Sequence, residues 1–295
     1  STSLIFSDQA FSNSEDQRMK IALLYDFDKT LSDRDMQEYG FIEDLGIQDP
    51  GEFWGLVDHR SKANQMDHIL AYLFEMVHQS NRAGKPLTKA HLQQYASRVQ
   101  FYPGVEEWFE LINHYGATLG YEIEHYIVSS GLKEIIEATP IAKYFKKVFA
   151  CEYYYDEQGH AIWPKLTVNY TMKTQFIYRI NKGVLDVAND EDLNKHQADE
   201  DKPVPFTHMI YIGDGLTDVP SMKLVKSSGG HSIAVYPPGK GVQAVTRDLL
   251  GYNRVDFVAK ADYSDRSRLH HLITTIINTL HSQDQLAAMP KGENL

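Results

Sequence analysis

The sequence predicts an α/β protein in which a parallel sheet is covered by helices on both faces. Two observations carry this prediction. Short apolar segments, typical of buried strands, alternate along the chain with segments of helical period. Three of the apolar segments end directly in Asp, Ser or Gly, as strands of open α/β sheets do beside their binding sites. Region 32–102 shows helical periodicity only, so we predict a helical insertion after the first strand.

The expected strands are short and apolar. The first is Ile21–Tyr25, which ends at Asp26 and has no polar alternation, as expected of a strand buried on both faces. A β-hairpin is expected around the turn Asp156–Gly159, between 149–155 and 160–163. The remaining strands are expected at 124–128, 208–212, 233–236 and 257–259.

The expected helices follow from apolar residues three and four positions apart. Inside the insertion, such a stripe is formed by Met66, Ile69, Leu70, Leu73, Met76 and Val77. Thr88 is placed to cap a helix over 90–100. Other helices are expected at 105–114, 132–137, 174–181 and 268–280. Segment 186–203 is acidic and poor in large apolar side chains, so we expect a solvated loop.

The amino-acid composition limits the partners and the cellular location that we expect for the protein. The 295 residues carry 40 Asp and Glu against 29 Lys and Arg, a formal charge of −11 that disfavours nucleic-acid and membrane partners. Apolar runs are too short to span a bilayer, the first residues do not resemble a secretory signal, and one cysteine fits a reducing compartment. We expect a soluble, cytoplasmic protein with a lead-in (1–18), a core (19–31 and 103–295) and a helical insertion (32–102).

The polar residues that follow the strands point to a metal site. Asp26 and Asp28 follow the first strand, Ser129 follows the second, and Asp214 and Asp218 follow 208–212. If these strands are neighbours, the four carboxylates meet at one edge of the sheet, where their repulsion calls for a cation. Oxygen ligands without His or Cys favour a hard ion, most naturally Mg²⁺.

The spacing of Asp26 and Asp28 suggests paired roles. Two residues apart on an extended segment, their side chains share a face, so one can attack as a nucleophile while the other moves a proton. Beside Mg²⁺ and a serine hydroxyl, such a pair suits phosphoryl transfer, which depends on positioning and charge neutralisation. The alternative is that both residues only cap or turn the chain, since Asp favours both.

Four segments in order resemble the motifs of the haloacid dehalogenase superfamily of phosphohydrolases. They are DFDKT (26–30), IVSSG (127–131), the helix-opening Lys173 and GDGLTD (213–218). The resemblance runs from Met19 to the C-terminal helix and implies a Rossmann-like core. In that family the first aspartate is phosphorylated, so Asp26 is expected as the nucleophile and Asp28 as the general acid and base.

The resemblance also implies the metal and phosphate ligands. Mg²⁺ is expected on Asp26, Asp214 and the backbone carbonyl of Asp28, with Asp218 as a further carboxylate on the metal side. The phosphate is expected to bind the Ser129 hydroxyl, the neighbouring residues Ser130 and Gly131, and Lys173. Lys165 is the alternative for the lysine, but it follows Pro164 at the end of the expected hairpin.

The insertion lies where phosphoserine-phosphatase-like members carry a helical cap, which closes over small substrates. Residues expected to face the substrate are Thr30, Arg34, Asp35 and Thr217. Two of them differ from those phosphatases, which have Glu at the position of Asp35 and Asn at that of Thr217. The serine substrate is therefore not carried over, and the sequence leaves the substrate open.

The resemblance as a whole implies a Mg²⁺-dependent phosphomonoester hydrolase that acts on a small phosphorylated metabolite through an aspartyl-phosphate. A phosphotransferase or mutase of the same superfamily is the alternative enzyme, because the motifs do not distinguish water from another acceptor. A catalytically silent binding protein is the alternative from another class. The sequence does not indicate the oligomeric state.

Overall fold

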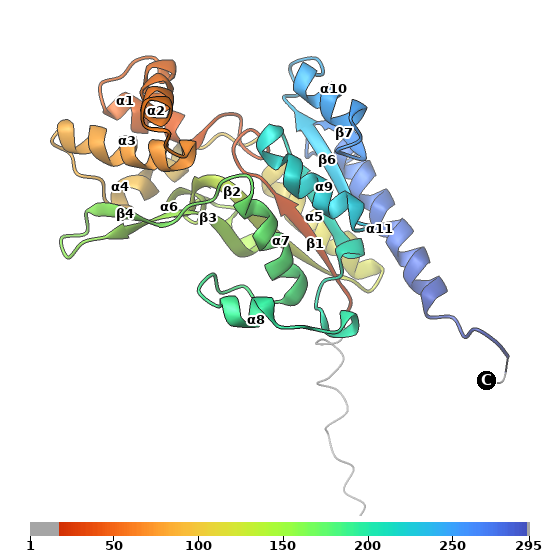
Figure 1. Cartoon of the computed structure of the whole chain (residues 1–295). Helices are drawn as coiled ribbons and strands as arrows, with labels where there is room; N and C mark the ends of the chain where they lie inside the picture. The colour runs from red at the N-terminus through yellow and green to blue at the C-terminus, as the bar shows by residue number, and fades with distance from the viewer. Residues whose placement is uncertain (1–17, 294–295) are drawn as a thin grey trace, which may run out of the picture.

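A computed structural model describes residues 18–293, so nearly all of the expected lead-in 1–18 lies outside the described residues. Its centre is one seven-stranded sheet with the order β4-β3-β2-β1-β5-β6-β7 (Figure 1). The strands are β1 (Lys20–Tyr25), β2 (Glu122–Leu132), β3 (Phe145–Tyr155), β4 (Ala161–Leu166), β5 (Met209–Gly213), β6 (His231–Tyr236) and β7 (Phe257–Lys260). All neighbouring pairs are parallel except the hairpin β3–β4.

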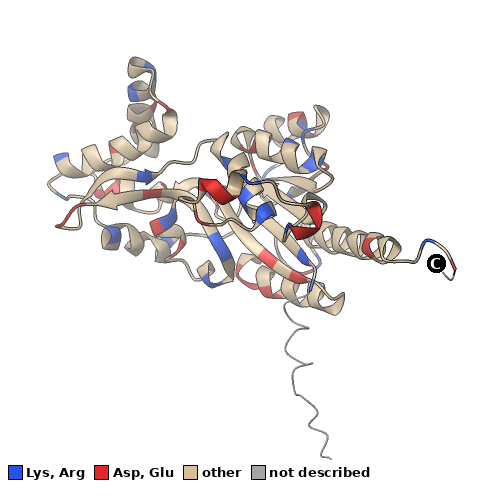
Figure 2. Ribbon diagram, turned by 60° about the horizontal axis from the view of Figure 1, so that its bottom comes forward, with Lys and Arg blue, Asp and Glu red and all other residues tan. Residues whose placement is uncertain are grey.

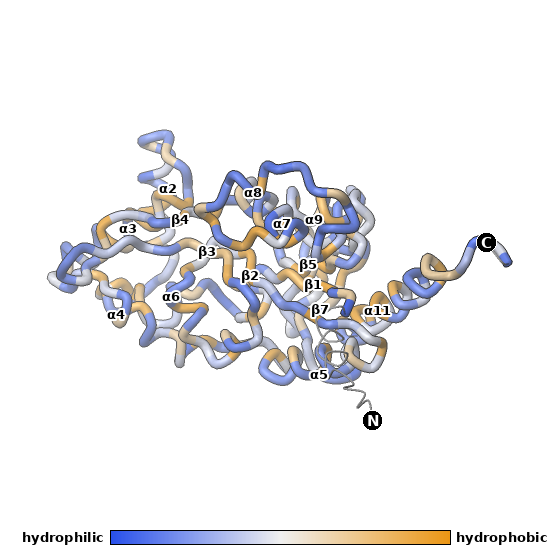
Figure 3. Tube along the Cα trace, turned by 90° about the horizontal axis from the view of Figure 1, so that it is seen from below, coloured by the Kyte–Doolittle hydropathy of each residue, from blue (hydrophilic) through white to orange (hydrophobic). Residues whose placement is uncertain are grey.

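Helices cover both faces of this sheet, as the sequence predicts. α7 (Met172–Lys182) and α9 (Val219–Ser227) lie on one face, and α5 (Val105–Thr118) and α11 (Arg268–Ala287) on the other (Figures 1 and 3). This double cover explains why Ile21–Tyr25 of β1 is completely buried. The remaining helices of the core are α6 (Lys133–Ile136), α8 (Asp190–Asn194) and α10 (Ala244–Gly251).

Region 32–102 contains α1 (Phe41–Asp44), α2 (Pro50–Asn64), α3 (His68–Arg82) and α4 (Lys89–Gln93), with short 3₁₀ turns. Asp67 caps α3 by accepting a hydrogen bond from the Leu70 N–H, so Met66 precedes this helix rather than belonging to it. Thr88 caps α4 as predicted, accepting from the His91 N–H at 3.1 Å. The expected helix 90–100 continues only as a 3₁₀ helix over Gln94–Arg98.

Two further expectations need correction. β2 does not end at Val128: the backbone stays extended through Ser129–Gly131, with an irregular register against β3. The acidic segment 186–203 is not a plain loop, because it contains α8 and a 3₁₀ turn at Asp199–Asp201. The fully buried Arg179 of α7 organises it by donating to backbone carbonyls of this segment and to the carboxylate of Asp190 at 2.7 Å.

Charged residues of both signs are scattered over the described ribbon (Figure 2). Within residues 18–293, no helix has both the length and the hydropathy needed to cross a membrane.

Candidate active site

The carboxyl ends of three adjacent strands bring the sequence motifs together. β1 is paired on one side with β2 and on the other with β5, and Tyr25 is level with both Ile127 and Ile212. The residues that follow, including Asp26 and Asp214, therefore meet at one edge of the sheet. They line a cavity of about 590 Å³ that is also bordered by α2 and α3.

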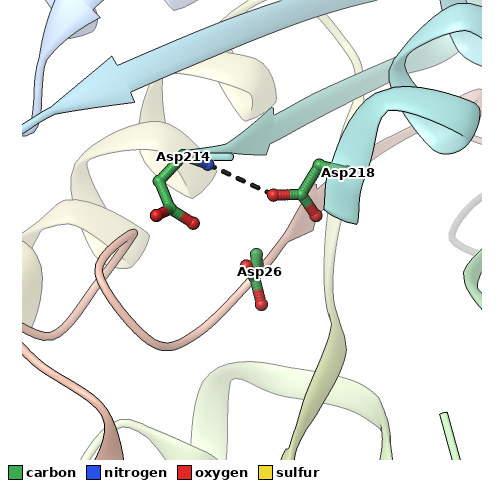
Figure 4. A group of neighbouring side chains, drawn as sticks. All are labelled: Asp26, Asp214 and Asp218. Atoms are coloured by element: carbon green, nitrogen blue, oxygen red, sulfur yellow. Dashed lines mark hydrogen bonds between the residues drawn. The ribbon is translucent and has the colours of Figure 1, made fainter. Parts of the chain in front are cut away.

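Three carboxylates converge in this region. Oxygens of Asp26, Asp214 and Asp218 all lie within 4.8 Å of one another, and Figure 4 shows the three side chains gathered in one region. Burial raises the pKa of Asp26 well above its ordinary value, and the negative charge of Asp218 adds to this effect. The same two causes raise the pKa of Asp214 to about 6. A cation would relieve this repulsion.

Lys173 supplies a buried positive charge. Its Nζ lies 2.9 Å from Asp218 Oδ1 and 3.6 Å from Asp26 Oδ1, and its side chain is almost entirely buried. Burial by itself would lower the pKa of Lys173, but the carboxylates of Asp218 and Asp26 outweigh it and raise the pKa. The alternative lysine, Lys165, lies elsewhere on the exposed β4 and pairs with Glu152 at 3.2 Å.

Asp218 is engaged through both oxygens. Oδ1 accepts hydrogen bonds from Lys173 and, at 2.6 Å, from the Tyr211 hydroxyl. Oδ2 accepts from the N–H groups of Asp214 and Gly215 at 3.3 and 3.4 Å. Because its oxygens are already used in this way, we infer that Asp218 positions Lys173 and the Asp214 loop, while Asp26 and Asp214 have more freedom to hold a metal.

Asp28 lines the same cavity but does not belong to the carboxylate triad. Its Oδ1 accepts a hydrogen bond from the Met36 N–H at 3.1 Å. Burial, followed by the nearby charge of Asp35, raises the pKa of Asp28 well above its ordinary value. A raised pKa favours the protonated form of the carboxyl, which is the form that a general acid needs. Lys29 follows with a positive φ of 61° and lies 3.6 Å from Asp35.

The end of β2 presents hydroxyl groups to the cavity. Ser129, Ser130 and Gly131 all line it. The Ser129 Oγ accepts from the Gly131 N–H at 2.9 Å, whereas the buried Ser130 Oγ has no hydrogen-bond partner within residues 18–293. A Cβ at position 131 would overlap the flexible end of the Met36 side chain, which would have to move to make room for it.

The four expected substrate residues divide into two groups. Asp35 and Thr217 line the cavity, but Thr30 and Arg34 do not. Thr30 is fully buried and its hydroxyl donates to Asp214 Oδ1 at 3.3 Å, so it supports Asp214. Arg34 points to Asp33, with Nε 3.0 Å from Oδ1, at the exposed surface.

Several cavity residues were not expected from the sequence. They include Lys29, Gln37, Trp54, His68, Ile69, Tyr72 and Gln243. Trp54 and Tyr72 come from α2 and α3, and their rings contact each other with centroids 6.2 Å apart. The apolar stripe of α3 indicated that Ile69 packs in the core, and gave no sign that it lines a cavity. An isolated Trp or Gln in a helical region does not indicate a binding role.

No family model matches the sequence. A curated relative is an uncharacterized protein of Borreliella burgdorferi, 28% identical over 86% of this chain and 95% of that protein.

Solved structures are similar in fold. A phosphoserine phosphatase, captured as a phospho-aspartyl intermediate analogue, matches with a TM-score of 0.53 and 14% identity over 88% of this chain and 99% of its own. A probable phosphoserine phosphatase from Vibrio cholerae matches with a TM-score of 0.54 and 14% identity over 90% of this chain and 67% of its own. A HAD family hydrolase from Salmonella enterica serovar Typhi matches with a TM-score of 0.51 and 18% identity over 77% of this chain, which spans only 64% of that protein. The expected fold is thereby confirmed: this chain has the fold shared by HAD-family hydrolases and phosphoserine phosphatases.

Proposed function

We propose that this protein is a Mg²⁺-dependent phosphomonoester hydrolase that acts on a small phosphorylated metabolite through an aspartyl-phosphate at Asp26. One observation carries the proposal. The carboxylate of Asp26 lies 3.6 Å from the Lys173 ammonium and next to Asp214, in a cavity that Asp28 also lines. This set provides a nucleophile, a neutralising cation, metal ligands and a proton donor. The shared fold of HAD phosphatases supports it.

The donor set fits Mg²⁺, because it consists of oxygens without His or Cys, and because the repulsion among the carboxylates is relieved by a divalent ion. Asp26, Asp214 and the backbone carbonyl of Asp28 would hold the ion. When bound, Mg²⁺ supplies positive charge beside the phosphoryl oxygens.

The protein's own groups account for the steps. An oxygen of Asp26 attacks phosphorus, and the bond to the leaving oxygen breaks as that oxygen takes the proton of Asp28. Asp28 then removes a proton from water, whose oxygen attacks phosphorus and releases Asp26 and phosphate. Lys173 offsets negative charge on Asp26 and the phosphoryl group, and Ser129 and Ser130 bind phosphoryl oxygens.

We propose that region 32–102 acts as a cap over this chemistry. α2 and α3 place Trp54 and Tyr72 in the cavity wall, so movement of these helices would open or close it. A closed cap excludes water from the first step and strengthens the interactions with the phosphoryl group. The cytoplasmic location stays a prediction.

The test is phosphate release from a panel of small phosphate esters, with Mg²⁺ and with a chelator. Asp26→Asn is expected to lower turnover by about three orders of magnitude or more, because the amide cannot serve as the nucleophile. Asp58→Asn is the matched control, since Asp58 is exposed and forms a surface ion pair with Lys62. Equal turnover in Asp26→Asn and the wild type would contradict the mechanism. Transfer of phosphate to an added alcohol in place of water would indicate a phosphotransferase.

A further inference from the structure

A buried tyrosine outside the cavity contacts the carboxylate that holds Lys173. Tyr211 lies in β5, is completely buried and is not among the residues that line the cavity. Its hydroxyl donates a hydrogen bond of 2.6 Å to Asp218 Oδ1, the same oxygen that accepts from Lys173 Nζ at 2.9 Å. A hydrogen bond this short from a hydroxyl to a carboxylate is charge-assisted and strong. Tyr211 therefore reaches the proposed chemistry through Asp218.

The orientation of Asp218 depends on few contacts. Asp218 is completely buried, so water cannot replace a partner that it loses. Its Oδ2 accepts from the N–H groups of Asp214 and Gly215 at 3.3 and 3.4 Å, which are long and weak hydrogen bonds. A Cβ at Gly213 would lie 2.5 Å from Oδ2, so the carboxylate packs directly against the backbone there. Of the four hydrogen bonds that the described residues donate to Asp218, the one from Tyr211 is the shortest and does most to fix Oδ1.

The position of Asp218 Oδ1 decides how Lys173 is shared. Lys173 Nζ lies 2.9 Å from this oxygen and 3.6 Å from Asp26 Oδ1, so the ammonium is nearer to Asp218 than to the proposed nucleophile. The hydroxyl hydrogen of Tyr211 offsets part of the negative charge on Oδ1 and thereby weakens its attraction for Lys173. Without this hydrogen bond the attraction is stronger and the carboxylate is free to turn. Both changes draw the ammonium away from Asp26.

We propose that Tyr211 is a positioning residue, whose hydroxyl holds Asp218 Oδ1 in place so that the Lys173 ammonium stays shared with Asp26. This inference rests on the proposed function and adds to it a residue that acts on the reaction through a neighbour. In the sequence, Tyr211 belongs to an apolar segment that indicates only a buried strand.

The first test removes the hydroxyl oxygen and keeps the ring. With Mg²⁺ and the best ester of the panel, Tyr211→Phe is expected to lower kcat by about tenfold and to change KM by less than about twofold, because the charge at the nucleophile changes while the substrate contacts do not. Tyr126→Phe is the matched control. Tyr126 is also a buried tyrosine of a strand, and its hydroxyl donates to Glu124 at 3.3 Å, outside the cavity. An unchanged kcat in Tyr211→Phe, or an equal fall in both variants, would overturn the inference.

A double-mutant cycle tests whether Tyr211 acts through Asp218. Asp218→Asn removes the negative charge that attracts Lys173. In that background, Tyr211→Phe should lower kcat by less than about twofold, since the carboxylate through which Tyr211 acts is absent. A loss of packing would instead lower kcat by the same factor in both backgrounds, and that result would contradict the positioning role.

A binding measurement separates this inference from the proposed function. Calorimetry with Mg²⁺ and beryllium trifluoride, a mimic of a phosphoryl group on aspartate, needs the Lys173 charge but no turnover. We expect Tyr211→Phe to weaken this binding by about tenfold and Tyr126→Phe to leave it unchanged. Ester hydrolysis with a wild-type kcat in Tyr211→Phe would overturn the inference and leave the proposed function supported. If no ester is hydrolysed, the expected weakening supports the positioning role and contradicts hydrolysis, whereas equal binding, or none, contradicts both.

Discussion

Two buried clusters of polar side chains begin at consecutive residues of the sequence. They differ in how their charges and hydrogen-bonding groups are paired inside the protein. Tyr25 and Asp26 are consecutive residues at the end of β1. Asp26 belongs to the cavity, where its carboxylate lies close to those of Asp214 and Asp218. The Tyr25 hydroxyl instead contacts His125 Nδ1 and accepts from Trp108 Nε1, both at 2.9 Å.

The second cluster is complete within the protein. His125 Nε2 contacts Asn113 Oδ1 at 2.7 Å, so an imidazole with its hydrogen on Nε2 gives every donor an acceptor. Burial lowers the pKa of His125 to about 3, which keeps it neutral. The comparison teaches that burial alone does not mark a functional site. Here the distinguishing feature is the crowding of buried carboxylates, whose repulsion raises their pKa values.

The largest effect on stability is expected when the cavity loses its buried cation. Lys173→Met leaves Asp26 and Asp218 buried without it, so we expect the free energy of unfolding, measured with a chelator at pH 8, to fall by about 3–5 kcal/mol. Lys165→Met, which removes an exposed lysine, should cost less than about 1 kcal/mol. Equal losses in urea titrations of the two variants would contradict the role of Lys173.

Acid should disrupt the second cluster. Because the pKa of His125 is lower in the folded protein than its ordinary value, the unfolded chain binds the proton first, and stability falls as the pH drops below about 6.5. We expect His125 alone to account for a loss of about 2.5 kcal/mol between pH 7 and pH 4.5. His125→Gln keeps a donor and an acceptor but does not titrate. Its unfolding free energy should change less over this range, and an identical pH profile would refute the assignment.

Added Mg²⁺ should stabilise the protein through the cavity alone. At a concentration about 100 times its Kd, a ligand that binds only the folded state contributes about 2.7 kcal/mol. The pKa of Asp214 is about 6, so protons compete with the metal and the rise in Tm should shrink between pH 8 and pH 5. Asp214→Asn should abolish this rise, whereas His125→Gln should retain it. A pH-independent rise in Tm would argue against a carboxylate site.

The smallest effect is expected from removing one charge of the triad. The pKa of Asp26 is raised in the folded protein, so its ionisation costs stability as the pH rises. In a chelator at pH 8, Asp26→Asn should raise the free energy of unfolding by about 1 kcal/mol, although the same variant is expected to lose most of the turnover. The gain should vanish below pH 4, where the carboxyl is protonated. A loss of stability at pH 8 would show that the contact with Lys173 outweighs the repulsion.

Local sequence patterns predicted much of the fold and part of the candidate site. Apolar strands that end in Asp26, Ser129 and Asp214 indicated both the sheet and the edge where those residues meet, because parallel strands place their carboxyl ends together. Segment 186–203 was misread, since its order depends on Arg179, a residue of another element whose partners are mostly backbone carbonyls. Contacts of this kind leave no periodic trace in the sequence.

The sequence by itself determined the class of fold, the strands that end in polar residues and the types of those residues. Each of these features can be read from the pattern of apolar and polar residues within one short segment. Only the tertiary structure decided which residues share that cavity. It placed Gln37 and Trp54 in the wall, turned Thr30 toward Asp214, and left Arg34 outside. The physical reason is that a side chain's surroundings depend on packing between segments far apart in the chain, whereas local patterns report only which face of a strand or helix is apolar.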